Sequence, residues 1–106
     1  VFAYPSFAET SPGPALEALA MGRPLIVADA PGTRELVDER VNGCLAQPDE
    51  PEALAAAVRS YLKRPDLIPA MARSSRQKAE RRYDRRLVMA AMFDLLGLER
   101  AEVAGA

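Results

Sequence analysis

Three short apolar runs divide the chain, and each is bounded by residues that favour turns. The runs are "VFAY" at residues 1–4, "PLIVA" at 24–28 and "CLAQP" at 44–48. Short apolar runs next to Gly, Pro, Asn or Ser predict β-strands. The middle run is apolar without alternation, which is typical of a parallel strand that is buried on both faces.

Between and after these runs, apolar residues recur at helical spacing. Pro14 suits the first position of a helix, because its missing N–H would have no partner there, and Gly22 suits a left-handed helix end. Asp49 is the expected N-cap of a later helix. The apolar stripe of that helix is expected at Leu54, Val58, Tyr61 and Leu62. The expected helices span residues 14–21, part of 31–37, 49–64, 65–82 and 85–96.

This alternation of strands and helices predicts an α/β fold with a parallel sheet. Three strands amount to about half of a doubly wound nucleotide-binding domain. We therefore expect half of a Rossmann-like domain over residues 1–98, with about three parallel strands flanked by helices and three helices at the C-terminal end. Residues 99–106 are expected to form a disordered tail, and a chain that begins directly with a strand is expected to be a fragment.

Composition excludes several classes of protein. The chain has 106 residues, of which 49% are hydrophobic and 27% charged, so one small packed domain is expected. It contains no histidine and one cysteine, which removes His-based metal sites, Ser-His-Asp triads and internal disulfides. We expect no metal and no cofactor. A lone cysteine favours a reducing, cytoplasmic location, and a membrane-peripheral location stays open for the parent protein.

Charge is concentrated near the C-terminal end, where residues 73–86 contain seven basic and two acidic residues. Such a stretch could contact anionic lipid or nucleic acid. Tyr83 is its only aromatic residue, and helical spacing distributes the charges around the axis. A solvated helix face is the simpler interpretation, and no nucleic-acid partner is expected. Cys44 is interpreted as a small apolar core residue and Asp29 as a turn residue.

The candidate site lies between the first two strands. Glu9 and Glu17 are separated by seven residues, and the loop that carries Glu9 follows a strand. Ligands of open α/β sheets bind outside the carboxyl ends of the strands. The helix that starts near Pro14 would direct free N–H groups and the positive end of its dipole toward the same space, and Gly13 would allow close approach of the backbone. Glu17 is expected in the first turn of this helix.

Two carboxylates next to a phosphate would repel it. Their presence makes sense if they accept hydrogen bonds from neutral hydroxyls on either side of the phosphate. A nucleotide sugar has this layout, with a ribose diol, a diphosphate and sugar hydroxyls in series. The plainer interpretation makes Glu17 a carboxylate near a helix start and Glu9 an exposed loop acid, without a ligand.

Five ordered blocks carry a family resemblance. They are the E-x7-E pair, "EALAMGRPLI", "PGTREL", "VNG" and "DEPEALAAAV". Together they resemble the C-terminal domain of the family 4, group 1 retaining glycosyltransferases of the GT-B fold. The resemblance covers about residues 1–96. The glutamate spacing is a weak signal by itself, whereas the ordered set is a specific one.

The resemblance implies a role for each matching residue. Glu17 matches the glutamate that binds the ribose of the donor nucleotide, and Glu9 matches the one beside the transferred sugar. Glu9 is therefore the candidate catalytic residue, although it is better described as a donor contact than as a nucleophile. The loop Thr10, Ser11, Pro12 and Gly13 matches backbone that holds the sugar and diphosphate. The expected partner is a nucleotide-sugar donor, with an acceptor glycan, lipid or small molecule bound by an N-terminal domain outside this chain.

Some features depart from the family, and two other functions stay open. Pro14 removes a backbone N–H where the family is expected to have one, and the basic residues that neutralise the diphosphate are expected upstream of Val1. The alternatives are a non-catalytic module that acts by interaction, and a GT-B-like sugar-nucleotide epimerase. The isolated chain is expected to be inactive and to self-associate, because open strand edges and the apolar helix at 85–96 would seek partners.

Overall fold

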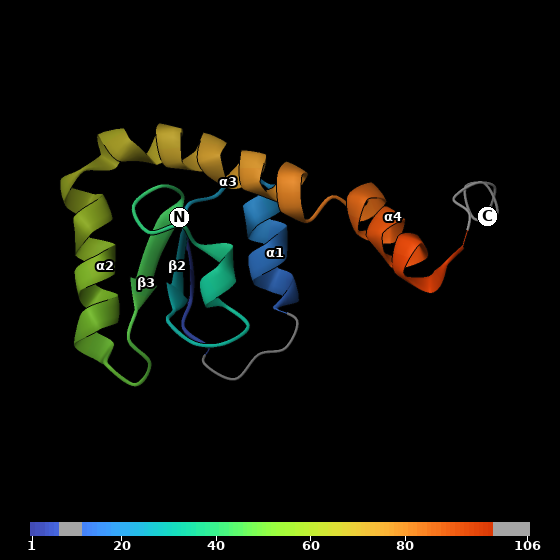
Figure 1. Ribbon diagram of the computed structural model, residues 1–106. Helices are drawn as coiled ribbons and strands as arrows, with labels where there is room; N and C mark the ends of the chain where they lie inside the picture. The colour runs from blue at the N-terminus through green and yellow to red at the C-terminus, as the bar shows by residue number, and fades with distance from the viewer. Residues whose placement is uncertain (7–11, 99–106) are drawn as a thin grey trace.

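A parallel three-stranded sheet forms the centre of the computed structural model, which describes residues 1–6 and 12–98 (Figure 1). The strands are β1 (Phe2–Tyr4), β2 (Leu25–Ala28) and β3 (Gly43–Ala46), in the spatial order β1-β2-β3. Phe2 pairs with Leu25, and Leu25 pairs in turn with Gly43. The predicted α/β class, the parallel sheet and the three strand positions are confirmed.

Helices connect and follow the strands in the predicted order. The α-helices are α1 (Gly13–Ala20), α2 (Pro51–Lys63), α3 (Ile68–Arg82) and α4 (Arg85–Leu96), and the short 3-10 helices are η1 (Arg34–Leu36) and η2 (Pro65–Leu67). Gly22, which follows α1, has a φ of 71°, so its predicted left-handed conformation is confirmed.

The two faces of the sheet are covered by different helices (Figure 1). On one face, α1 and η1 pack through Leu19 and Leu36 against Leu25 and Val27 of β2. On the other face, α2 packs through Tyr61 against Ile26. All four residues of β2 are buried, because β2 is the central strand between both layers. This explains why its sequence is apolar without alternation.

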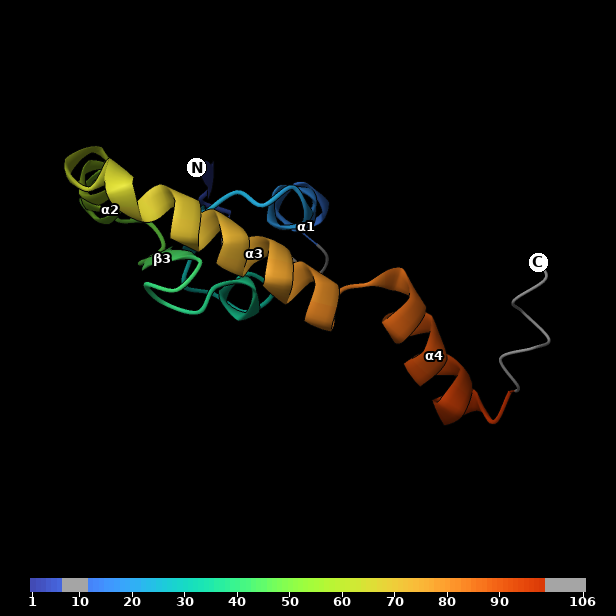
Figure 2. The ribbon, with the colours of Figure 1, turned by 90° about the horizontal axis from the view of Figure 1, so that it is seen from above.

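The third layer is α3, which runs across the edge where the strands begin (Figures 1 and 2). Met71 joins the core on the α2 face and Ala79 joins the core on the α1 face. Ser75 is fully buried and its hydroxyl donates to the carbonyl oxygen of Asn42 at 3.3 Å, just before β3 begins. Helix α3 therefore closes the amino-terminal edge of the sheet and leaves the opposite edge open.

A tight approach between backbones fixes the start of β3. A Cβ atom on Gly43 would collide with the carbonyl oxygen of Leu25, its partner on β2. The preceding Asn42 is also buried; its side chain accepts from the N–H of Asp38 at 2.7 Å and donates to the carbonyl oxygen of Leu36 at 2.9 Å. In the "VNG" block, Asn42 thus bonds the backbone of the turn before β3, and Gly43 allows β3 to approach β2 closely.

Helix α2 differs from its prediction in two ways. It begins at Pro51 with Glu50 at the cap position and no side-chain cap, and Asp49 has a left-handed φ of 59°, so the expected N-cap at Asp49 is wrong. Tyr61 and Leu54 pack on the core as expected, but Val58 and Leu62 are 40% and 75% exposed. Among the described residues, the sheet therefore covers Val58 only in part and leaves most of Leu62 exposed.

Helix α4 extends away from the sheet and meets the rest of the chain near the end of α3 (Figure 2). Its bounds match the prediction. The carboxylate of Asp84 caps it by accepting from the N–H of Arg86 at 2.8 Å, and Gly97 ends it at a φ of 71°. Its exposed apolar side chains are Leu87, Val88, Met92, Leu95 and Leu96. The tail predicted at 99–106 lies outside the described residues.

Candidate functional site

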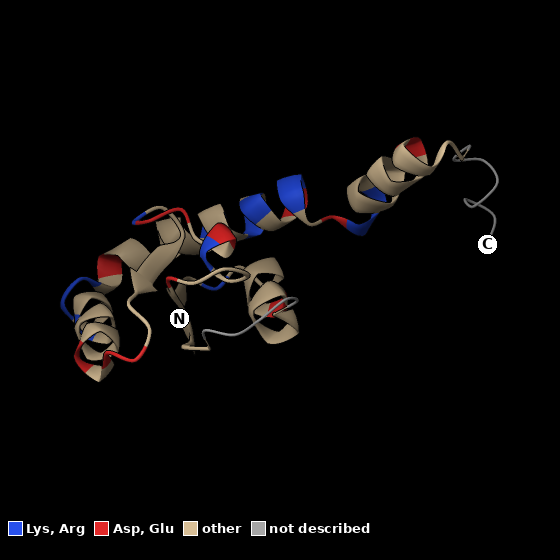
Figure 3. Ribbon diagram, turned by 60° about the horizontal axis from the view of Figure 1, so that its bottom comes forward, with Lys and Arg blue, Asp and Glu red and all other residues tan. Residues whose placement is uncertain are grey.

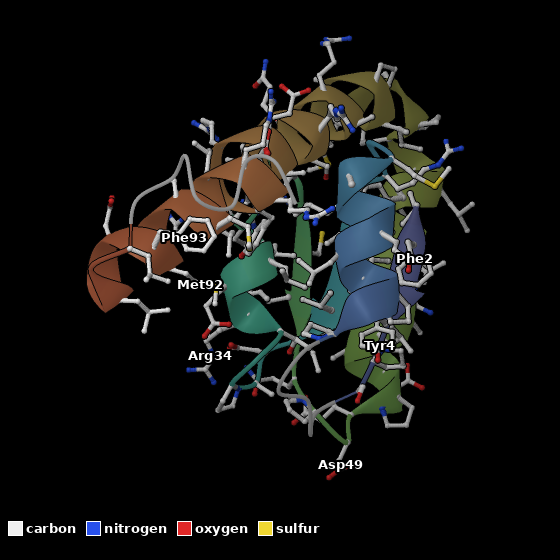
Figure 4. All side chains as sticks on the ribbon, turned by 90° about the vertical axis from the view of Figure 1, so that its right-hand side faces the viewer. Phe2, Tyr4, Arg34, Asp49, Met92 and Phe93 are labelled. Carbon is white, nitrogen blue, oxygen red and sulfur yellow. The ribbon has the colours of Figure 1, made fainter. Side chains whose placement is uncertain are left out.

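The open edge of the sheet is where the three strands end, at Tyr4, Ala28 and Ala46. It lies at the bottom of Figure 1, where α1 also begins. Side chains from several elements reach it: Figure 4 shows Tyr4 from β1, Arg34 from η1 and Asp49 from the loop before α2 toward this end. In a parallel α/β sheet this is the edge that binds ligands.

The loop after β2 is held rigidly at this edge. The hydroxyl of Thr33, which is fully buried, donates to the carbonyl oxygen of Ala28 at 2.7 Å and approaches that of Ala30 at 3.2 Å. Gly32 takes a φ of 89°, which an L side chain would strain. Sequence reasoning missed Thr33, although its place directly after a Pro-Gly turn was a usable signal.

Polar groups line the same loop. The guanidinium of Arg34 pairs with the carboxylate of Asp29 at 3.2 Å, and the amide of Gln47 reaches that carboxylate at 3.5 Å. Asp29 was predicted as a turn residue; its side chain instead joins the ends of β2 and β3 through these contacts.

Helix α1 begins at this edge without a side-chain cap. Pro12 occupies the cap position and is buried, and its carbonyl oxygen accepts from the N–H of Leu16 at 3.0 Å. A Cβ atom on Gly13 would meet nothing within 4 Å among the described residues, so these residues leave space beside the first residue of α1. An uncapped helix start next to open space favours an anionic group.

Glu17 projects from α1 on the side away from the sheet. The buried residues of α1 are Ala15, Ala18 and Leu19, and Glu17 is exposed. Because α1 begins at Gly13, Glu17 is its fifth residue and belongs to the second turn. The expectation of an acidic residue in the first turn is therefore wrong. Glu17 lines a hollow of about 540 Å³ between α1, the end of α3 and the start of α4.

The remaining candidate residues, Glu9, Thr10 and Ser11, lie outside the described residues. The structure therefore places Pro12 at the cap position of α1, and Gly13 and Glu17 within the helix. The distance in space between Glu9 and Glu17 stays untested.

A second hollow of about 250 Å³ lies on the α2 side of the same edge. Its walls include Pro5, Ala46 and Leu54, and its rim includes Asp49 and Glu50. Sequence reasoning did not identify it, because its residues come from three separated segments. Its apolar walls and acidic rim do not suit a diphosphate.

Ionisable groups away from this edge have structural roles. Burial raises the pKa of Tyr61 well above its usual value, and the neighbouring Cys44 adds to this effect. Tyr61 and Cys44 belong to the core on the α2 face, which agrees with a packing role for the cysteine. Among the described residues there is no cluster of acidic or cysteine side chains that could hold a metal ion. No helix of the described chain is long and apolar enough to cross a membrane.

The basic stretch at 73–86 lies on α3 and the start of α4 (Figure 3). Because α3 crosses the amino-terminal edge of the sheet, this stretch does not belong to the open edge. The expectation of a solvated face is wrong for Lys78, whose side chain is only 8% exposed and pairs with Asp38. Arg76 is exposed as expected, and its guanidinium also donates to the carbonyl oxygen of Ala20 at the end of α1.

An open parallel half-sheet, with an uncapped helix start at its carboxyl edge, defines an α/β protein of the Rossmann-like class. The sequence profile of the family described as "Glycosyl transferases group 1" matches residues 1–64. The chain therefore belongs to the group 1 glycosyltransferases, as the resemblance in the sequence implied. The matched region contains the whole open edge and all of α1.

Curated relatives agree with this family. A D-inositol 3-phosphate glycosyltransferase from Streptomyces griseus is 34% identical over 80 residues, which are 76% of this chain and 17% of that protein. A glycogen synthase from Mycobacterium tuberculosis is 38% identical over 77 residues, which are 73% of this chain and 19% of that protein.

Solved structures of the GT-B fold share this architecture. Anabaena Alr3699/HepE in complex with UDP has a TM-score of 0.84 and 28% identity over 90% of this chain and 26% of that chain. Sucrose-phosphate synthase from Thermosynechococcus elongatus has a TM-score of 0.82 and 25% identity over 98% of this chain and 25% of that chain. The chain thus spans about a quarter or less of the length of the relatives it matches.

Proposed function

We propose that residues 1–98 form the C-terminal half of the donor-binding domain of a retaining glycosyltransferase. The enzyme transfers a sugar from a nucleotide sugar to an acceptor that a further domain binds. The observation that carries the proposal is the position of the family match: residues 1–64 include the uncapped start of α1, the space beside Gly13 and the exposed Glu17.

The proposal assigns a role to each candidate residue. Glu17 accepts hydrogen bonds from the ribose diol, and the start of α1 at Pro12 and Gly13 faces the diphosphate. Glu9 contacts the hydroxyls of the transferred sugar, with Thr10 and Ser11 in the connecting loop. The titles of the HepE structures, in complex with UDP and with UDP-glucose, support a nucleotide-sugar donor.

The other two functions are less well supported. An epimerase of similar fold would share only part of the ordered set of motifs, whereas the glycosyltransferase profile matches residues 1–64, which contain all five blocks. A module that acts only by interaction is less well supported, because the family that the chain matches is one of glycosyltransferases.

The test of the donor site uses the intact enzyme that carries this chain and titrates it with UDP, GDP and ADP. Glu17→Ala is expected to weaken the preferred nucleotide about tenfold to a hundredfold, because a charge-assisted hydrogen bond contributes roughly 1.5–3 kcal/mol. Glu17→Gln keeps one acceptor oxygen and is expected to lose less. Glu52→Ala is the matched control, since Glu52 is also an exposed helix carboxylate but lies on α2. Equal nucleotide affinity in wild type and both Glu17 variants would reject the assignment.

The stereochemistry is tested separately, on the product. An enzyme of the proposed type converts an α-linked nucleotide sugar into an α-linked product, and the anomeric proton coupling in the NMR spectrum reports the configuration. Formation of an epimerised sugar, still linked to the nucleotide or released by hydrolysis, without transfer to any acceptor would instead identify an epimerase.

A further inference from the structure

We propose that Arg76 is a positioning residue for donor binding, because it fixes the end of α1 and thereby the direction of Glu17. This inference rests on the proposed function, in which Glu17 contacts the ribose. Arg76 lies on α3, on the far side of α1 from the helix start, and it is not part of the sequence motifs that identify the donor site.

The guanidinium of Arg76 joins two elements. Its Nη1 donates to the carbonyl oxygen of Ala20, the last residue of α1, at 2.6 Å. Its Nε donates to the carboxylate of Glu80 at 2.7 Å, one turn further along α3. The second bond orients the guanidinium plane, so that Nη1 points at α1. A cation at the last carbonyl groups of a helix also opposes the negative end of the helix dipole.

The anchored carbonyl is close to Glu17 along α1. Ala20 follows Glu17 by three residues, which is less than one helical turn and a rise of about 5 Å. The next residue, Met21, donates its N–H to the carbonyl oxygen of Glu17 at 2.9 Å. Glu17, Ala20 and Arg76 also line the same hollow. A shift at Ala20 is therefore transmitted directly to the turn that carries Glu17.

Helix α1 needs such an anchor for two reasons. It has eight residues and no side-chain cap at its start, and a helix of this length is not stable by itself. Two of its three buried residues are alanines, Ala15 and Ala18, which give little resistance to rotation about the helix axis. Gly22 lets the chain turn back next to the carbonyl oxygen of Ala72, so α3 touches the end of α1 at a second point.

The test compares nucleotide binding in the intact enzyme with Arg76→Ala and Arg73→Ala. Arg73 lies one turn earlier on α3 and is exposed. Its side chain makes no hydrogen bond or ion pair with the described residues. Both changes remove one positive charge, but only Arg76→Ala releases α1. We expect Arg76→Ala to weaken UDP binding about three- to tenfold, comparable to the loss of one good hydrogen bond, and Arg73→Ala to leave it unchanged.

Uridine separates positioning from charge. If Arg76 acts by orienting Glu17 toward the ribose, UDP and uridine lose affinity by the same factor. If Arg76 acts as a positive charge near the diphosphate, UDP alone loses affinity and the proposal is wrong. The Michaelis constant for the donor should rise in parallel while that for the acceptor stays constant, which a general loss of stability would not produce.

A double variant provides the decisive comparison. When Glu17 is already alanine, Arg76→Ala should cause no further loss of nucleotide affinity, because the group that it orients is absent. Independent, additive losses would overturn the inference, as would wild-type affinity in Arg76→Ala. If Glu17→Ala alone binds nucleotide normally, the proposed function itself fails. Arg76→Lys keeps the charge but not the planar fork, and it replaces the alanine variant if that variant does not fold.

Discussion

The Nζ atom of Lys78 lies 3.1 Å from the carboxylate of Asp38, so the middle of α3 is ion-paired with the turn that precedes β3. The two partners differ in exposure, since the side chain of Lys78 is 8% exposed and that of Asp38 is 55% exposed. The largely buried side chain of Lys78 therefore ends at a carboxylate that solvent reaches.

Removing this cation should weaken the fold modestly. Lys78→Met keeps much of the buried stem but loses the ion pair. We expect it to lower the free energy of unfolding by about 1 kcal/mol or less. Lys78→Ala also loses the packing of the stem and should cost more, about 1–2 kcal/mol. Urea denaturation of the 106-residue chain measures both. A loss equal to that of the exposed Arg73→Ala would show that the pair has no structural value.

Substitution by alanine should affect the stability of the fold differently at two glycines, Gly43 and Gly13. Gly43→Ala places a Cβ against the carbonyl of Leu25 inside the sheet, and we expect a loss of about 3 kcal/mol in stability. Gly13→Ala meets nothing in the described structure and lies in a helix, so the fold should be unchanged or slightly more stable, by about 0.5–1 kcal/mol.

Gly13→Ala nevertheless bears on function. If the diphosphate approaches the start of α1, the added methyl group should weaken UDP binding in the intact enzyme while stability is maintained. Thermal unfolding and UDP titration of the same sample separate the two effects. Unchanged UDP affinity in a stable Gly13→Ala variant would argue against a close approach at this position.

The cap of α4 should depend on acid. Hydrogen bonds from the side chain and the backbone of Arg86 hold the pKa of Asp84 below its usual value. A carboxyl whose pKa is lowered by folding stabilises the folded state above its unfolded pKa, and this contribution disappears as the pH falls through the folded value. Below about pH 4 the first turn of α4 should begin to fray.

Hydrogen exchange at the first amides of α4 measures this fraying. Asp84→Asn keeps an oxygen that can cap the helix but cannot titrate, so its exchange should be less dependent on pH in the acid range. Equal pH dependence in wild type and Asp84→Asn would assign the acid response to another group.

Self-association of the isolated chain stays a prediction, and the structure indicates where to test it. Leu95 and Leu96 are 87% and 66% exposed on α4, which makes this helix the richest exposed apolar surface of the described chain. Sedimentation velocity across a concentration series should show association that Leu95→Glu reduces. Leu62→Glu on α2, at a position that is 75% exposed, is the matched control. A monomer at every concentration would contradict the prediction.

Local pattern predicted most of the fold. The apolar runs located all three strands because a buried central strand needs apolar residues on both faces, and Pro14, Gly22 and the break at 83–84 located helix ends by backbone preference. The prediction of Asp49 as the N-cap failed for two reasons. Asp49 itself has a left-handed backbone, and the helix begins at Pro51, which puts Glu50 at the cap position. Composition alone cannot distinguish a turn acid from a capping acid.

Contacts of α3 could not be predicted from the same pattern. Arg76 bonds to a residue 56 positions earlier, Lys78 to one 40 positions earlier and Ser75 to one 33 positions earlier. In the sequence these residues look like the polar face of a helix, because helical periodicity says nothing about which face meets a distant segment. For the candidate site, motif order nominated Glu17, and its role stays a prediction. Its place in the second turn of α1 could not be predicted, because it depends on where the helix starts.

Helix α3 follows all three strands in the sequence, so it is synthesised after the sheet whose amino-terminal edge it closes. The last strand ends at Ala46, but the side chains that close the sheet, Ser75 and Lys78, follow about 30 residues later. At ribosomal rates of about 5–20 residues per second, this interval lasts roughly 2–6 s. For that time the core residues that α3 covers, and the end of α1 that it contacts, have no covering helix. A chaperone that recognises apolar segments would therefore have access to the core residues next to Met71 and Ala79, and would lose that access once α3 has docked.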